Sequence, residues 1–171
     1  MPRRRIDRFL NDALNDFSHW LKSNQWRGKE HDCVNLFAHK FLFDKIEPGA
    51  AIENLAQISI ECGLKQPKNG NYINSFARKD LVIWREPQQN SWSETWDSAN
   101  IPKVVMEWKV IFRSKFPKEI FDSHDEKWIH LYTKENKDCF GYIVSVDLTS
   151  ETRKVYWKFS KQGVFSNTFC I

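Results

Sequence analysis

The hydrophobic period of this chain changes near residue 58, and this change restricts the possible fold more than any other feature. Between residues 5 and 21, apolar side chains recur at helical spacing, at Ile6, Phe9, Leu10, Ala13, Leu14, Phe17, Trp20 and Leu21. That spacing places them on one face and predicts a long amphipathic helix. Gly28 interrupts the pattern, and the apolar residues of segment 29–43 predict a second helix.

After residue 58, short apolar runs replace the helical spacing, which is typical of strands. These runs predict strands at residues 58–62, 79–84, 104–112, 142–148 and 155–159. Residues 123–137 predict a further helix, with Ser123 as its N-cap. The order helix, helix, three strands, helix, two strands indicates an α/β or α+β domain with one central mixed sheet flanked by helices.

The length of 171 residues fits a single domain. Within it we distinguish an N-terminal helical extension (residues 1–27), a core (28–150) and a C-terminal strand and tail (151–171). Hydrophobic residues make up 41% of the chain and aromatic residues 15%. This is enough to bury a core, so a disordered chain is not expected.

The location suggested by the sequence is the cytoplasm. No apolar run is long enough to span a membrane, and the basic N-terminus is not followed by the apolar stretch of a secretory signal. The four cysteines, Cys33, Cys62, Cys139 and Cys170, show no CxxC spacing and do not cluster with histidines. We therefore expect small buried hydrophobic side chains in a reducing compartment rather than a zinc site.

The charge balance of the chain is mildly basic. The net charge is +4 and the pI is about 8.8. Such a charge permits a polyanionic partner but does not require one.

The strand predicted at residues 104–112 carries two charges within an apolar run. Alternate residues of a strand share a face, so Glu107 and Lys109 lie side by side. The opposite face is apolar and is expected to meet the core; it carries Val104, Met106, Trp108 and Val110. A charge on such a strand costs free energy to bury, which indicates a purpose. The plain alternative is a cross-strand salt bridge at a sheet edge.

Asp80 stands directly before the apolar run Leu81–Trp84. If this strand pairs with the strand at 104–112, Asp80 and Glu107 converge on one point. Two carboxylates, together with waters and a backbone carbonyl, suit a hard cation such as Mg²⁺. A lysine beside that cation can position an attacking water and can offset the charge that grows on a phosphate.

Asp80, followed later by Glu107-Trp108-Lys109, resembles the motif of the PD-(D/E)xK nuclease superfamily, which has the restriction-endonuclease-like fold. The segments RKDLVIW and VVMEWKV carry the resemblance, which extends from about residue 29 to residue 148. Asp125-Glu126-Lys127 and Glu135-Asn136-Lys137 also match the short motif, but both fall in the predicted helix. Lys79 stands where the motif has proline.

The resemblance implies a magnesium-dependent deoxyribonuclease, expected to be an endonuclease, in which Mn²⁺ can replace Mg²⁺. Asp80, Glu107 and the backbone carbonyl of Trp108 would hold the metal, and Lys109 would organise the nucleophilic water. Glu30, at the start of the second helix, is the best match for a further glutamate that faces the metal. The partner would be a nucleic acid, DNA by expectation, and a homodimer is possible.

Basic residues beside the predicted site are expected to contact phosphates: Arg78, Lys79, Arg113 and Lys115. The basic N-terminus at residues 3–8 is a weaker candidate because it is not tied to the predicted metal. Trp92 and Trp96 are expected to pin the polar segment 86–100, with base stacking as the alternative. Glu61 is expected on a solvated strand face, with an approach to the metal as the alternative.

Two other interpretations of the same residues remain open. The domain could bind nucleic acid or a protein without cutting it, since a nuclease fold can lose catalysis and keep binding. Alternatively, the acid–lysine pair could be structural, in a domain of unrelated function.

Overall fold

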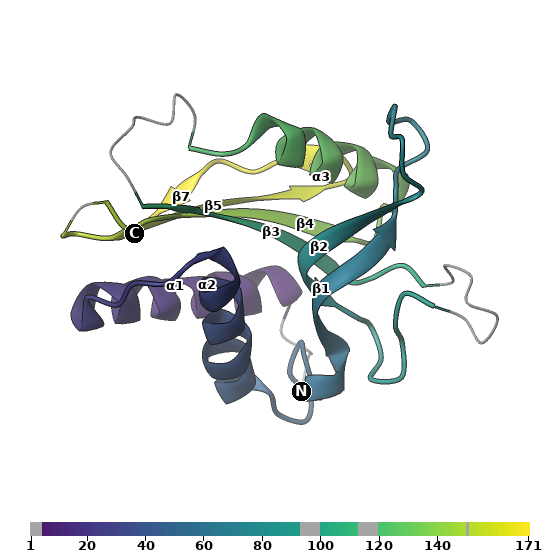
Figure 1. Ribbon diagram of the computed structural model, residues 1–171. Coiled ribbons are helices and arrows are strands. Elements are labelled where there is room, and N and C mark those ends of the chain that lie inside the picture. Colours follow the sequence, from purple (N-terminus) through teal and green to yellow (C-terminus); the bar gives the residue numbers. More distant parts are fainter. Residues whose placement is uncertain (1–4, 93–99, 113–119, 150) are drawn as a thin grey trace.

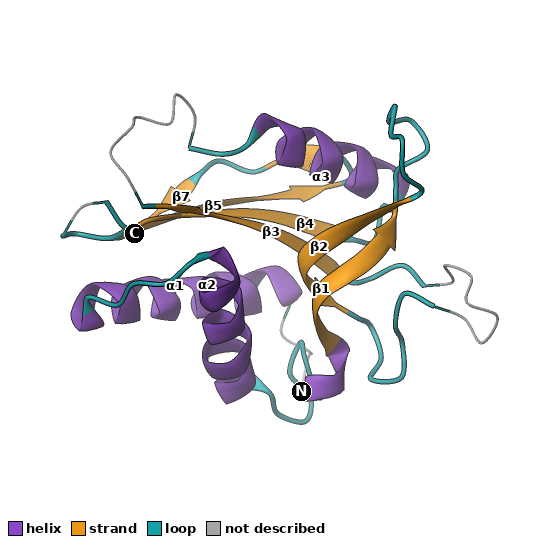
Figure 2. Cartoon of the chain, in the orientation of Figure 1, coloured by secondary structure: helices purple, strands orange, loops and turns teal. Residues whose placement is uncertain are grey.

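The computed structural model describes residues 5–92, 100–112, 120–149 and 151–171. A mixed sheet forms the middle layer, with helices α1 and α2 against one face and helix α3 against the other (Figure 1). Figure 2 shows the same layers by secondary structure. The mixed α/β architecture with a central sheet flanked by helices is therefore as the sequence predicts.

The helices follow the predicted positions closely. They are α1 (Ile6–Asn24), α2 (Glu30–Leu36), the π-helix η1 (Phe37–Leu42), the 3₁₀ turns η2 (Phe43–Lys45) and η3 (Leu55–Gln57), and α3 (Ser123–Glu135). The expected second helix is thus a continuous helical path whose middle widens into a π-helix. The N-cap of α3 is Asp122 rather than Ser123, because the Asp122 carboxylate accepts hydrogen bonds from the backbone of His124 and Asp125.

The strands of the described chain are β1 (Ile58–Lys65), β2 (Phe76–Ile83), β3 (Val104–Ile111), β4 (Phe140–Asp147), β5 (Lys154–Lys161), β6 (Val164–Phe165) and β7 (Phe169–Cys170). Their order in the sheet is β1-β2-β3-β4-β5-β6, with β7 also paired to β5. Strands β3 and β4 are parallel, and the other neighbouring pairs are antiparallel. The short strands β6 and β7 were not predicted from the sequence.

The parallel step from β3 to β4 follows from the helix between them. A parallel connection needs a crossover, and α3 provides it across one face of the sheet. On that face the side chains of Trp128, Ile129 and Tyr132 from α3 pack against Val105 and Ile143 of the sheet. The N-terminus of α3 therefore lies at the same end of the sheet as the C-terminal part of β3.

The opposite face carries the larger core. Helix α1 buries its apolar stripe there except for Trp20, which is partly buried, and the alternate residues Val104, Met106 and Trp108 of β3 meet it as predicted. The Trp108 indole packs against the ring of Phe17 from α1 (centroids 5.6 Å apart) and the ring of Phe37 from η1 (5.1 Å). Helix α1 and the π-helix η1 thus fix the position of β3 at the residue between Glu107 and Lys109.

The cysteines follow the sequence expectation only in part. All four lie in described residues and none forms a disulfide; Cys33 and Cys139 are buried, Cys62 is half-buried and Cys170 is exposed. Among the described helices, none combines the length and apolar character needed to cross a membrane.

Candidate functional site

Strand β2 leaves strand β3 at Asp80. The β2–β3 ladder pairs Ile83 with Val104 and Leu81 with Met106, and it stops there, although both strands continue. Beyond this point the Asp80 carboxylate replaces the missing backbone partner, because its Oδ2 accepts a hydrogen bond of 2.7 Å from the Trp108 N–H. The next pair in this register is Asp80 with Glu107, so the two carboxylates lie where the strands part.

The hairpin of β1 and β2 also changes face at this level. Glu61 adopts a left-handed backbone conformation (φ 55°) in the middle of β1, and its register partner would be Asp80. Ile60, before this point, packs into the core on the α1 face of the sheet. Leu64, after it, packs into the core on the α3 face. This change of face brings Lys79 to the same side of the sheet as Glu107.

Lys79 forms a buried ion pair with Glu107. Its ammonium contacts Glu107 Oε1 and lies 3.7 Å from the ring centroid of Trp128. The residue is only 4% exposed. The sequence interpretation placed Lys79 among the surface residues that contact phosphate; the structure places it inside, because the change of face at Glu61 turns it toward α3.

Asp80 and Glu107 lie close enough for their charges to affect one another. Burial, the largest effect, raises the pKa of Asp80, and the hydrogen bond from the Trp108 N–H lowers it. Burial likewise raises the pKa of Glu107 to about 8, against the opposing effect of Lys79, and the charge of Asp80 raises it further. Each of these two carboxylates disfavours the ionisation of the other, an effect that a cation between them would relieve.

Lys109 and Glu30 form the exposed side of the site. The Lys109 ammonium lies 3.9 Å from Glu30 Oε2, and both side chains are about half-exposed. Glu30 is the first residue of α2, so the N-terminus of this helix reaches the gap between β2 and β3. Burial raises the pKa of Glu30, and the charge of Asp80 raises it further. The four residues predicted from the sequence, Glu30, Asp80, Glu107 and Lys109, are therefore brought together.

Asp125 is a fifth member that the sequence interpretation did not select. It lies in the first turn of α3, three residues before Trp128, and it is half-buried. Its charge raises the pKa values of Glu30, Asp80 and Glu107. The available signal was the short match Asp125-Glu126-Lys127, which the sequence analysis set aside because it falls in a helix.

The acidic groups at this site should make stability depend on pH. Burial raises the pKa of Glu107 above 4.5, so the folded protein holds a proton that the unfolded chain releases. The stability that Glu107 contributes is therefore fully present below about pH 4.5 and is lost as the pH rises toward 8. Without metal, we expect the free energy of unfolding to fall by on the order of 2–4 kcal/mol between pH 5 and 8.

Urea titrations at several pH values measure this dependence, and Glu107→Gln is the matched variant. Glutamine keeps an acceptor for Lys79 but cannot titrate, so its stability should change much less with pH. Equal pH dependence in both proteins would show that Glu107 is ionised in the fold throughout this range.

The other residues that the sequence analysis selected differ in their surroundings. Arg78 is exposed and forms an ion pair of 3.5 Å with Glu61, which is less exposed. Trp92 packs on Phe76 with ring centroids 5.1 Å apart, so it contacts the body of the protein as expected. Arg113, Lys115 and Trp96 lie outside the described residues.

A metal at this site would need ligands beyond side chains. Within the described ranges, no three His, Cys, Asp or Glu side chains are grouped as ligands of one ion. The converging pair Asp80 and Glu107 supplies two carboxylates, and hard cations such as Mg²⁺ fill their remaining positions with carbonyl oxygens and water. The oxygen donors present fit such a cation.

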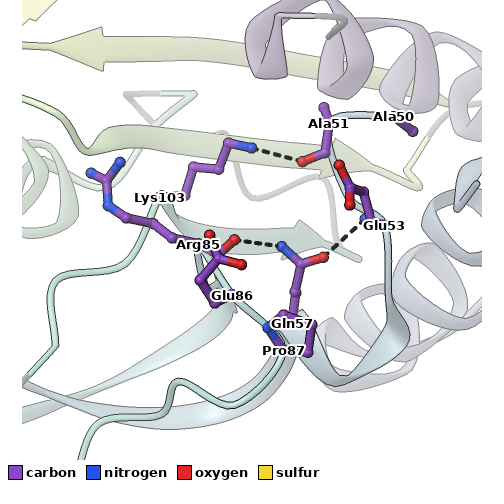
Figure 3. Close-up of a pocket in the computed structure, with 8 residues that line it drawn as sticks. All are labelled: Ala50, Ala51, Glu53, Gln57, Arg85, Glu86, Pro87 and Lys103. Carbon is purple, nitrogen blue, oxygen red and sulfur yellow. Dashed lines mark hydrogen bonds between the residues drawn. The ribbon is translucent and has the colours of Figure 1, made fainter. Parts of the chain in front are cut away.

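A small cavity lies at the opposite end of β1, β2 and β3, with a volume of about 40 Å³ (Figure 3). Lys103 donates to the Ala51 carbonyl at 2.7 Å, and Gln57 donates to the Arg85 carbonyl at 2.9 Å. These bonds connect the loop before β1 to the starts and ends of the strands. The polar groups that line this cavity hold the fold together, and the cavity is separate from the acidic site.

Comparisons of this chain with protein-family models, with curated proteins and with solved structures found no match.

Proposed function

We propose that this protein is a magnesium-dependent phosphodiesterase that cuts DNA, with the metal held by Asp80 and Glu107. The observation that carries the proposal is the arrangement of these two carboxylates. Each has one oxygen engaged by the protein, Asp80 Oδ2 by the Trp108 N–H and Glu107 Oε1 by Lys79. A divalent cation held between the two carboxylates would neutralise both charges.

The Trp108 carbonyl is the proposed third ligand. In a strand, the N–H and C=O of one residue point to the same edge, and the Trp108 N–H points to Asp80. Its carbonyl is thus directed to the side that β2 has left. When bound, the metal would lower the pKa of a coordinated water and stabilise the charge that develops on the phosphate.

Lys109 is the residue that would orient the attacking water. Its ammonium is about half-exposed and is held only loosely by Glu30 at 3.9 Å. It can therefore turn toward a bound phosphate at little cost. Glu30 would hold the metal through water, and Asp125 adds negative charge on the α3 side.

Other features support the family proposal. A central mixed sheet flanked by helices is what a restriction-endonuclease-like fold implies, and the proposed ligands lie on β2 and β3 within it. Arg78, exposed two residues before Asp80, is well placed to contact a phosphate of the substrate. Four cysteines without a disulfide agree with a cytoplasmic enzyme.

The direct test measures cleavage and metal binding on the same protein. We expect purified protein to cut DNA with Mg²⁺ or Mn²⁺, and Asp80→Asn to lose at least about 100-fold in rate. Asparagine still accepts the Trp108 N–H, so the fold should persist. Calorimetry in buffers of different ionisation enthalpy should show about one proton released per metal bound near pH 7.

A second candidate function is a binding module that no longer cuts. The observation that favours it is Lys79, whose ammonium already neutralises Glu107 in the metal-free protein. In that case Mg²⁺ at millimolar concentration would not bind at Asp80 and Glu107, no DNA or RNA would be cut, and nucleic acid would still bind.

A further inference from the structure

A second polar cavity lies between the end of α1 and the β4–β5 turn, away from the acidic site. Its volume is about 380 Å³, and it is lined by Gln25, Arg27, Thr149, Glu151 and Arg153. Gln25 connects its two walls, because its side-chain amide donates to the Lys22 carbonyl at 2.9 Å and to the Glu151 carbonyl at 3.2 Å. The cavity is therefore built between two segments that are distant in sequence.

The wall formed by Arg153 has an unusual charge balance. Arg153 is 2% exposed, and no carboxylate of the described residues forms an ion pair with it. Its Nη2 donates to the backbone carbonyl and the side chain of Gln25, whereas Nε and Nη1 have no acceptor among the described residues. A buried guanidinium without a carboxylate partner is costly, so its positive charge favours an anion in the adjacent cavity.

A second arginine lies at the same cavity. Arg27 is exposed and enters no ion pair with the described residues. Two guanidinium groups suit a tetrahedral oxyanion, which arginine recognises through paired hydrogen bonds. The Thr149 hydroxyl already donates to Asp147 Oδ1 at 2.6 Å. Among the described lining residues Glu151 is the acidic one, and its charge opposes such an anion.

We propose that this cavity binds a phosphate group of the nucleic-acid strand that occupies the acidic site. Arg27 precedes Glu30 by three residues, so their Cα atoms are at most about 11 Å apart. Such a separation is within the reach of a bound strand, which carries a phosphate about every 3.4 Å of helix axis. The phosphate site itself follows from the two arginines, whereas its assignment to a nucleic acid rests on the proposed function.

The first experiment titrates inorganic phosphate into the metal-free full chain and follows the heat of binding. Arg27→Ala should weaken binding by about tenfold or more, since it removes a charge-assisted contact from an exposed residue that the fold does not need. Glu151→Gln should strengthen binding. Lys137→Ala, which removes an exposed basic side chain just beyond α3, should leave it unchanged. Equal affinities for wild type, Arg27→Ala and Lys137→Ala would overturn the phosphate site.

The second experiment identifies the source of the phosphate, using Asp80→Asn to prevent cleavage. An oligonucleotide with a 5′-phosphate should compete with inorganic phosphate, and this competition should weaken in the Arg27→Ala background. If oligonucleotides do not compete at all, the ligand is a free phosphate compound and the nucleic-acid assignment is wrong. Arg27-dependent phosphate binding in a protein that cuts no DNA would refute the proposed function and keep the phosphate site.

Discussion

Lys109→Ala is expected to lower the rate of DNA cleavage by about 100- to 1,000-fold while the metal still binds. The lysine holds no metal in the proposed site; it orients the water and offsets charge on the phosphate. Because its ion pair with Glu30 is long and exposed, its loss should change the free energy of unfolding by less than about 1 kcal/mol. Single-turnover cleavage and metal titration measure the two effects separately.

The matched control is Lys137→Ala. Lys137 also ends a Glu-x-Lys match, in Glu135-Asn136-Lys137, but it is exposed just beyond α3. Its removal lowers the net charge equally and should leave cleavage unchanged. An equal loss of cleavage rate in the two variants would show that overall charge causes the effect and that Lys109 has no specific part in the reaction.

Trp108→Ala is expected to cause the largest loss of stability, about 3–5 kcal/mol. The indole is 2% exposed and packs between Phe17 of α1 and Phe37 of η1, so its removal leaves a cavity at the contact of three elements. Since Trp108 also fixes the strand between Glu107 and Lys109, metal affinity should fall as well. Urea denaturation measures the stability of the metal-free protein.

Trp108→Phe separates packing from hydrogen bonding. The Trp108 Nε1 has no hydrogen-bond partner in the described part of the chain, so phenylalanine loses ring volume and no bond. Its cost should stay below about 1.5 kcal/mol. A cost for Trp108→Phe close to that of Trp108→Ala would mean that the indole N–H has a partner and that packing is not the main contribution.

The sequence contained enough information to predict the layers and part of the site. Helical spacing in segment 5–21 and alternation in β3 depend on local periodicity, which burial of one face imposes directly on the residue pattern. The same alternation placed Trp108 in the core and Glu107 on the opposite face, as found. The convergence of Asp80 and Glu107 followed from assuming that their strands pair, and the register supports it.

Only the tertiary structure decided what surrounds those residues. Lys79 was expected at the surface, yet the left-handed backbone of Glu61 changes the face of the hairpin and buries it beside Glu107. Asp125 and Arg153 gained their roles from the placement of α3 and of the end of α1 against the sheet. Such contacts join residues far apart in the chain and depend on long-range packing and a single backbone angle, which a periodic pattern does not encode.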